Sequence, residues 1–125
     1  RKMLFEIAKE QHCNKLALGH HRDDAIESLL MSMMFNGTIA SMPPRLAMFD
    51  NTFTLIRPLI YITNKETMQY AKFRNFKQQK KACPYEQATN RHAIASIIDQ
   101  MEALSPHVRG NLFAAMKNIQ NEYLP

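Results

Sequence analysis

Two adjacent carboxylates follow a glycine and a pair of histidines near the start of this 125-residue chain. The six residues from Gly19 to Asp24 read Gly-His-His-Arg-Asp-Asp. Carboxylate oxygens bind Mg²⁺, and carboxylates beside imidazoles can also orient a nucleotide or act as acid and base. We therefore predict a site at this segment, with His21, Asp23 and Asp24 as its catalytic candidates.

The elements around this segment would position it. Residues 15–19 are typical of a short buried strand of a parallel sheet, and apolar residues then recur at helical spacing over residues 23–35. In open α/β sheets, ligands bind outside the carboxyl ends of the strands, so the polar side chains that follow this strand should face a ligand. Gly19 would let that ligand, or a second backbone, approach closely.

Two other interpretations of the segment remain open. Asp23 could be an ordinary helix cap, because carboxylates are favourable where they meet the positive end of the helix dipole. His20, His21 and Asp24 could instead bind zinc or iron, since imidazole and carboxylate suit both metals. We rank the metal site lower, because adjacent side chains on an extended segment point in opposite directions.

The rest of the chain continues an α/β alternation. Helices are predicted over residues 3–11, 23–35 and 65–75, the last capped by Asn64, and strands over residues 15–19 and 53–57. Asn36-Gly37 should end the second helix. Met42-Pro43-Pro44-Arg45 should form a stiff linker, because each proline fixes its φ. Arg57 closes the second strand, where its guanidinium could pair with a phosphate or with Asp24.

The end of the chain reads as a pair of helices that pack together, the second starting at Ser105-Pro106. Their apolar residues are Ile94, Ile97, Ile98 and Met101 in the first helix, and Val108, Leu112, Met116 and Ile119 in the second. An exposed remainder of this stripe would form a surface for a partner or for a homodimer. We place a boundary between residues 1–81, an incomplete α/β domain, and residues 82–125, the helical region.

Basic residues outnumber acidic ones, with a formal net charge of +5. They are densest in one short run without acids: Lys72, Arg74, Lys77, Lys80 and Lys81. Such a run suits a phosphate backbone, so we predict RNA contacts at Lys77, Lys80 and Lys81. The interleaved Tyr70, Phe73 and Phe76 could stack on bases, but their spacing favours the buried side of a helix.

Composition also bounds the location of the protein. No apolar run approaches the ~20 residues of a membrane helix and no leader precedes a cleavage site, so we expect a cytoplasmic protein without a membrane partner. Cys13 and Cys83 are then reduced thiols or metal ligands rather than a disulfide. From the sequence alone, we predict that Cys13 packs at the end of a helix. A lone cysteine such as Cys83 is more often structural than a ligand.

Four short elements follow one another along the chain: Gly-His-His-Arg-Asp-Asp with Glu27, then Met42-Pro43-Pro44, then Ile56-Arg57-Pro58-Leu59, and Cys83-Pro84 ahead of a helix. In their order and spacing they resemble the tRNA 2-thiocytidine synthetase branch of the PP-loop ATPases. Lysidine synthetases share the first and third elements. The Met-Pro-Pro element and the late cysteine select the thiolation branch.

The resemblance implies a Rossmann-like parallel sheet of the adenine nucleotide alpha-hydrolase type, present here in part and followed by the helical pair. It also implies adenylation of a tRNA base and sulfur transfer from a donor through a [4Fe-4S] cluster with Cys83 among its ligands. Arg45 would lie near a tRNA phosphate beside the target base. Residues implied to bind ATP and Mg²⁺ are Lys2, Gly19, His20, Asp24 and Arg57.

Two elements of that family do not occur in the sequence: the phosphate loop Ser-Gly-Gly-x-Asp-Ser and a Cys-x-x-Cys pair. Glu86 also stands where many relatives carry a further cysteine. Because glycine-rich loops supply the N–H groups that cradle phosphates, we expect this chain to be the C-terminal part of a longer enzyme and inactive alone.

The sequence thus favours part of an ATP-dependent tRNA thiolase, most like the cytidine thiolases. A ligase similar to lysidine synthetase, which needs no cluster, is the alternative enzyme. A fragment that only binds RNA and dimerises is the alternative outside enzymes.

Overall fold

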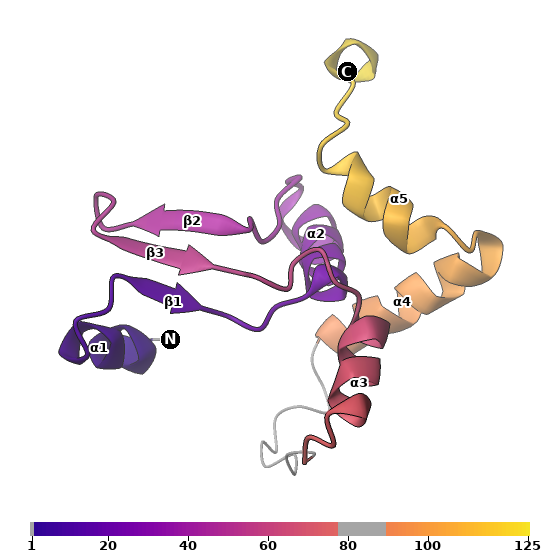
Figure 1. The fold of residues 1–125 in the computed structure, drawn as a ribbon. Coiled ribbons are helices and arrows are strands. Elements are labelled where there is room, and N and C mark those ends of the chain that lie inside the picture. The colour runs from indigo at the N-terminus through magenta and orange to yellow at the C-terminus, as the bar shows by residue number, and fades with distance from the viewer. Residues whose placement is uncertain (1, 78–89) are drawn as a thin grey trace.

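The computed structural model describes residues 2–77 and 90–125, and Figure 1 shows its elements. They are α1 (Lys2–Glu10), β1 (Lys15–Ala17), α2 (Arg22–Asn36), β2 (Arg45–Met48), β3 (Phe53–Ile56), α3 (Asn64–Phe73), α4 (Asn90–Leu104), α5 (Val108–Ala115) and a 3-10 turn at Asn121–Tyr123. This order confirms the predicted α/β class with helices at the end of the chain. None of the described helices is both long and apolar enough to cross a membrane.

The sheet has three strands in the order β1-β3-β2. β1 and β3 are parallel, as predicted, and Leu16 lies opposite Leu55. β2 is antiparallel to β3, with Arg45 opposite Ile56, and the sequence did not predict it. Arg45 is therefore the first residue of a strand, and the expected linker reaches only as far as Pro44.

A tight hairpin explains why β2 forms although its sequence is short and exposed. Three consecutive residues in the turn, Phe49, Asp50 and Asn51, have positive φ angles of 51°, 52° and 66°. Asp and Asn tolerate this conformation better than most residues. The turn brings residues 45–48 back along β3, which supplies the hydrogen-bonding partner that the sequence pattern alone does not reveal.

α2 ends as the sequence predicted. Gly37 stands at its C-cap in the left-handed conformation, with φ of 62°, and its N–H donates to Ser32 O. Glycine adopts this conformation without the steric cost of a side chain.

The main apolar cluster lies between helices. Ile26 of α2 packs with Ile94 and Ile98 of α4, and all three are buried. Leu112 and Phe113 of α5 pack against the same cluster, so the predicted pairing of the two C-terminal helices is confirmed and α2 joins it. Figure 1 shows these three helices beyond the end of the sheet. The predicted boundary between residues 81 and 82 lies outside the described residues and stays a prediction.

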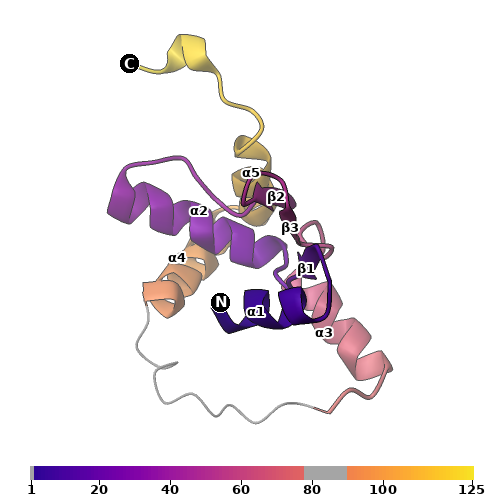
Figure 2. The same ribbon diagram turned by 90° about the vertical axis from the view of Figure 1, so that its left-hand side faces the viewer.

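α3 differs from its prediction in two respects. Its N-cap is Thr63, whose Oγ1 accepts from the N–H of Glu66, and not Asn64. The expected buried side of Tyr70, Phe73 and Phe76 is also wrong, because these side chains are 58%, 79% and 61% exposed. Figures 1 and 2 show the reason: α3 leads away from the sheet and from α5.

Candidate functional site

The candidate site lies where β1 and β3 end side by side. The N–H of Leu18 donates to Ile56 O at 2.9 Å, which continues the pairing of the two strands. Further on, the N–H of Arg22 donates to Ile62 O at 2.9 Å. Residues 18–24 and 57–64 therefore run together from the sheet to the starts of α2 and α3. This is the edge of a parallel sheet at which ligands bind in α/β proteins.

His21 and Asp24 fix the first turn of α2. His21 is the N-cap, and its Nδ1 accepts from the N–H of Asp24 at 3.4 Å, while Asp24 Oδ2 accepts from the N–H of His21 at 2.9 Å. The role of helix cap that we considered for Asp23 thus belongs to His21. With Nδ1 accepting, the proton of the neutral imidazole is on Nε2.

Asp24 and Glu27 form a small acidic group on one face of α2. Arg91 of α4 faces both, with its Nη1 3.7 Å from Asp24 Oδ1 and its Nε 3.4 Å from Glu27 Oε2. Burial raises the pKa of Glu27 above its ordinary value, Arg91 opposes the rise, and the neighbouring Asp24 adds to it. Two carboxylates thus share one guanidinium, and a further cation beside them would be stabilised.

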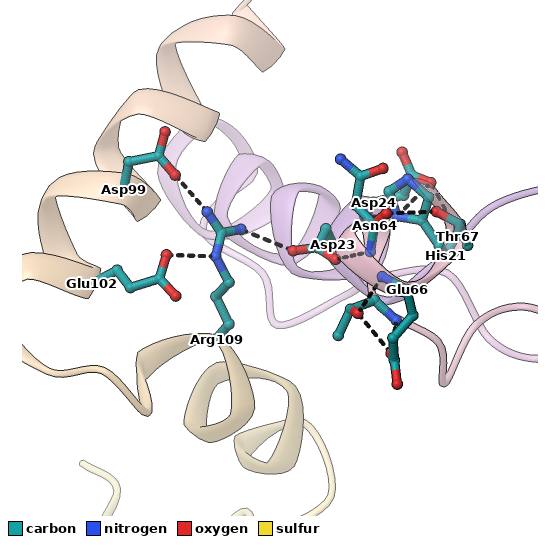
Figure 3. A network of polar contacts seen from close by, with 10 residues as sticks. His21, Asp23, Asp24, Asn64, Glu66, Thr67, Asp99, Glu102 and Arg109 are labelled. Carbon is teal, nitrogen blue, oxygen red and sulfur yellow. Dashed lines mark hydrogen bonds and ion pairs between the residues drawn. The ribbon is translucent and has the colours of Figure 1, made fainter. Parts of the chain in front are cut away.

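Asp23 points to different partners from Asp24 (Figure 3). It is buried, its Oδ2 accepts from the N–H of Asn64 at 2.7 Å, and its Oδ1 accepts from Nη1 of Arg109 at 2.9 Å. Both carboxylate oxygens of Asp23 thus hold groups of the protein itself. Of the two adjacent carboxylates, Asp24 is the one better placed to meet a ligand.

Arg57 connects three segments at the end of β3. Its buried side chain donates from Nη1 to Pro43 O at 2.6 Å and from Nε to His20 Nδ1 at 3.4 Å. Its own N–H donates to Pro44 O at 2.8 Å. The Met-Pro-Pro element and the histidine pair, which are separate in the sequence, are therefore joined through one guanidinium. Its predicted contact with a phosphate stays a prediction.

The Met-Pro-Pro element forms part of the wall of a pocket of about 280 Å³. Its walls are mostly apolar and come from α2, residues 39–44, residues 60–61 and the end of α5. The Tyr61 and Phe113 rings meet edge to face at 5.9 Å, and Lys117 Nζ lies 5.2 Å from the centre of the Tyr61 ring. The pocket offers aromatic and apolar surface with one cation near its wall, which suits a flat polar ring better than an ion.

Gly19 leaves open space at the carboxyl end of β1. A Cβ placed on Gly19 would meet no atom of the described residues within 4 Å. The described residues would therefore leave room for a side chain at position 19. This open space fits the predicted close approach of a ligand.

The remaining predicted residues lie apart from this group or outside the described residues. Arg45 is exposed on β2 opposite Ile56, and Lys77 is exposed after α3. Lys2 begins α1, but its side chain is outside the described part of the chain, as are Lys80, Lys81 and Cys83.

The described residues do not make a metal centre. They contain no group of three or more His, Cys, Asp or Glu side chains able to hold a metal ion, so His20, His21 and Asp24 do not form the zinc or iron site that we considered. Cys13 is exposed after α1, with its Sγ donating to Gln11 O at 3.5 Å. An iron–sulfur cluster commonly takes four thiolates, so it does not fit the described residues.

Two arginines of the site were not predicted. Arg91 and Arg109 meet the acidic residues of α2 only because α4 and α5 pack on that helix. No local sequence signal identifies them, since each is more than sixty residues from its partner on α2. The apolar stripe of the last two helices was the only available sign, and it predicted their packing but not their charged contacts.

The chain resembles known proteins along its whole length. A family model described as the PP-loop domain matches residues 1–101. Among curated relatives, the tRNA-cytidine(32) 2-sulfurtransferase of Syntrophotalea carbinolica is 35% identical over 126 residues, covering 99% of this chain and 49% of that protein. The enzyme of the same name from Verminephrobacter eiseniae is 38% identical over 125 residues, covering 99% of this chain and 40% of that protein.

A solved structure shares the fold. It is the U34-tRNA thiolase of Methanococcus maripaludis with its [4Fe-4S] cluster, which is 25% identical with a TM-score of 0.75 and matches 100% of this chain and 42% of that one. The chain spans about half the length, or less, of the curated relatives named above, at 49% and 40%.

Proposed function

Because the chain belongs to the PP-loop family, we propose that it is part of an ATP-dependent tRNA thiolase that acts on a cytidine. One observation carries this proposal. The Gly-His-His-Arg-Asp-Asp segment stands at the carboxyl ends of two parallel strands, and the buried Arg57 joins it to the Met-Pro-Pro element. A nucleotide site and a base site would therefore be neighbours, as transfer between them requires.

We assign the nucleotide to the acidic start of α2. Asp24 is the proposed ligand for the Mg²⁺ of ATP. Both oxygens of Asp23 are held at 2.7 and 2.9 Å by Asn64 and Arg109, whereas among the described residues Oδ1 of Asp24 has only the longer contact with Arg91 at 3.7 Å. Gly19 and His20 border the open space where the nucleotide would lie, with His20 held by Arg57. The Nε2 proton of His21 would donate to a phosphate oxygen.

We assign the target base to the pocket that the Met-Pro-Pro element helps to line. The name of the curated relatives describes transfer of sulfur to position 2 of a tRNA cytidine, where cytosine carries an oxygen. Adenylation of that oxygen by ATP releases pyrophosphate and makes the oxygen a good leaving group, and sulfur then replaces it with release of AMP. Arg45 and the basic segment around Lys77 would contact the tRNA backbone.

The sulfur source is a separate question from the nucleotide and the base. The related U34-tRNA thiolase was solved with its [4Fe-4S] cluster, but the described residues here do not fit a cluster. Cys83 as a cluster ligand, the sulfur donor, the homodimer and the cytoplasmic location stay predictions.

The proposal is tested by the product that the full-length protein forms. The protein is incubated with tRNA, Mg²⁺-ATP, a sulfide source and free lysine, and the nucleosides are examined by mass spectrometry for 2-thiocytidine and for a lysine-bearing cytidine. Asp24→Asn should lower adenylation at least about 100-fold, because the amide cannot replace the charge of a Mg²⁺ ligand. It keeps an oxygen for the N–H of His21, so α2 should still start at the same residue.

Asp50→Asn is the matched control, since it makes the same change at an exposed residue of the β2–β3 turn and should leave adenylation unchanged. Wild-type activity in Asp24→Asn would show that Asp24 is not the ligand. A product carrying lysine in place of sulfur would favour the ligase alternative, and unmodified tRNA with the wild-type protein would contradict the proposed function as a whole.

A further inference from the structure

Arg109, near the start of α5, is bound by three carboxylates from two other helices (Figure 3). Its Nη1 donates to Asp23 Oδ1 at 2.9 Å, its Nε to Glu102 Oε2 at 2.9 Å, and its Nη2 to Asp99 Oδ1. Asp23 belongs to α2, whereas Asp99 and Glu102 belong to α4. The guanidinium therefore connects the helical pair at the end of the chain to the helix that carries the candidate site.

The three ion pairs differ in how much water reaches them. The side chain of Asp23 is 12% exposed, against 43% for Glu102 and 69% for Asp99. Exposed pairs contribute little because water screens them, so the contact with Asp23 is the one whose loss should matter. Burial lowers the pKa of Arg109, but the carboxylates outweigh burial and raise it above its ordinary value, so the guanidinium stays charged.

Asp23 also contacts the start of α3. Its second oxygen accepts from the N–H of Asn64, one of the N–H groups that a helix leaves unpaired at its first turn. A single carboxylate, held from one side by Arg109, thus fixes the starts of both α2 and α3. Asp24 follows directly in the chain.

We propose that Arg109 is a positioning residue for the nucleotide site, which it serves through Asp23. The inference rests on the proposed function, because it concerns the geometry of the same site. Without Arg109, Asp23 would remain as a buried charge without its cation, and the first turn of α2 would loosen or move. His21 and Asp24 lie in that turn, so their alignment toward a phosphate would be lost with it.

The role requires the shape of arginine as well as its charge. The guanidinium donates in three directions at once from a rigid plane, whereas the ammonium of lysine is a single point of charge on a flexible stem. Arg109→Lys therefore keeps the positive charge but removes the simultaneous contacts with Asp23 of α2 and with the carboxylates of α4. Asp99→Asn is the matched control, because it removes the most exposed partner and leaves the contacts with Asp23 and Glu102 in place.

The first measurement is amide hydrogen exchange in the full-length protein. In Arg109→Lys, the N–H of Asn64 and the first turn of α2 should exchange about tenfold faster or more, because the lysine ammonium cannot hold Asp23 and the carboxylates of α4 at the same time. Asp99→Asn should stay within about twofold of the wild type, as expected for an exposed pair.

The second measurement is ATP-dependent adenylation. It is made at a temperature at which thermal denaturation curves show that all variants are folded. We expect kcat to fall about tenfold in Arg109→Lys with the KM for tRNA unchanged, because orientation at the nucleotide is lost and the tRNA surface is not touched. A merely structural role would lower Tm and leave kcat of the folded protein as it was. Asp23→Asn, which keeps an oxygen for Asn64, should reproduce the fall in kcat and replaces Arg109→Lys if that variant does not fold.

Unchanged exchange at Asn64 and α2, or faster exchange with unchanged kcat, would overturn the role of Arg109 while wild-type adenylation still supports the proposed function. A wild-type protein without adenylation would overturn both.

Discussion

Asp23 and Asp24 are neighbours in the sequence but have different surroundings. Asp23 is enclosed by Asn64 and Arg109, and Asp24 faces His21 and Arg91. The place of both residues was predictable, because a polar segment after a buried strand marks the carboxyl edge of a sheet. Their division of roles was not, because it depends on cations from helices far along the chain, whose packing the local pattern does not specify.

Glu27 provides a prediction about pH. Its pKa in the folded protein is raised above the ordinary value of 4.5, so the unfolded chain gives up this proton at a lower pH than the folded one. Stability is therefore lost as the pH rises from about 4.5 through the raised pKa, and Glu27→Gln should abolish that loss. We expect the variant to gain stability relative to the wild type between pH 4 and pH 7, because the wild type alone must keep a buried carboxylate charged at the higher pH.

Chemical denaturation of the full-length protein at the two pH values measures this gain, with Glu10→Gln on the exposed side of α1 as the control. Equal differences from wild type at both pH values would contradict the raised pKa.

Helices and strands were predictable to the extent that their own residues determine them. α2 begins and ends at signals in its sequence, a polar first turn and Asn36-Gly37, and its bounds agree with the prediction to within one residue at each end. β2 is a strand because it pairs with β3. The only signal for it in the local sequence was the Asp50-Asn51 turn. The exposure of α3 was mispredicted for a related reason. Its aromatic spacing suits a core, but no described element covers that side.

α3 should depend on its cap, because none of its residues is buried. Thr63 Oγ1 accepts from the N–H of Glu66 at 3.1 Å, and the hydrogen bonds from Thr63 to Glu66 lower the pKa of that carboxyl. Thr63→Ala should therefore destabilise the first turn by ~1 kcal/mol, seen as faster amide exchange confined to α3. Because the pKa of Glu66 is lowered, the wild-type cap should weaken as the pH falls through that pKa. The dependence should be smaller in the alanine variant, which keeps the backbone hydrogen bond to Glu66 but loses the one from the hydroxyl.

Thr67→Ala is the control, since its Oγ1 donates to Asn64 O and caps nothing. Equal exchange in the two variants would mean that helix propensity, and not the cap, holds α3.

Charge is distributed unevenly over the molecule as a whole. The acidic residues of α2 and α4 face Arg91 and Arg109, so much of the charge around the candidate site is balanced within the protein. The basic residues of α3 and its end, Lys72, Arg74 and Lys77, are exposed beside the exposed aromatic rings of Tyr70, Phe73 and Phe76. Cations with aromatic side chains form the surface that single-stranded nucleic acid prefers. Exposed positive charge and exposed aromatic rings thus lie together at α3 and the residues that follow it.

Reversing charge at that surface should weaken tRNA binding in a manner that depends on salt. In the full-length protein, Arg74→Glu with Lys77→Glu removes two phosphate contacts, so the slope of log K against log salt should become shallower by about 1.4 to 1.8. The control reverses two exposed lysines elsewhere, Lys9→Glu with Lys15→Glu on α1 and β1, and changes the net charge equally. A salt titration of tRNA affinity compares the two double variants. If both make the slope equally shallow, net charge alone attracts the tRNA and the surface at α3 has no special part. A change confined to Arg74 and Lys77 places the backbone of the tRNA along α3, because counterions are released only where phosphates and cations meet.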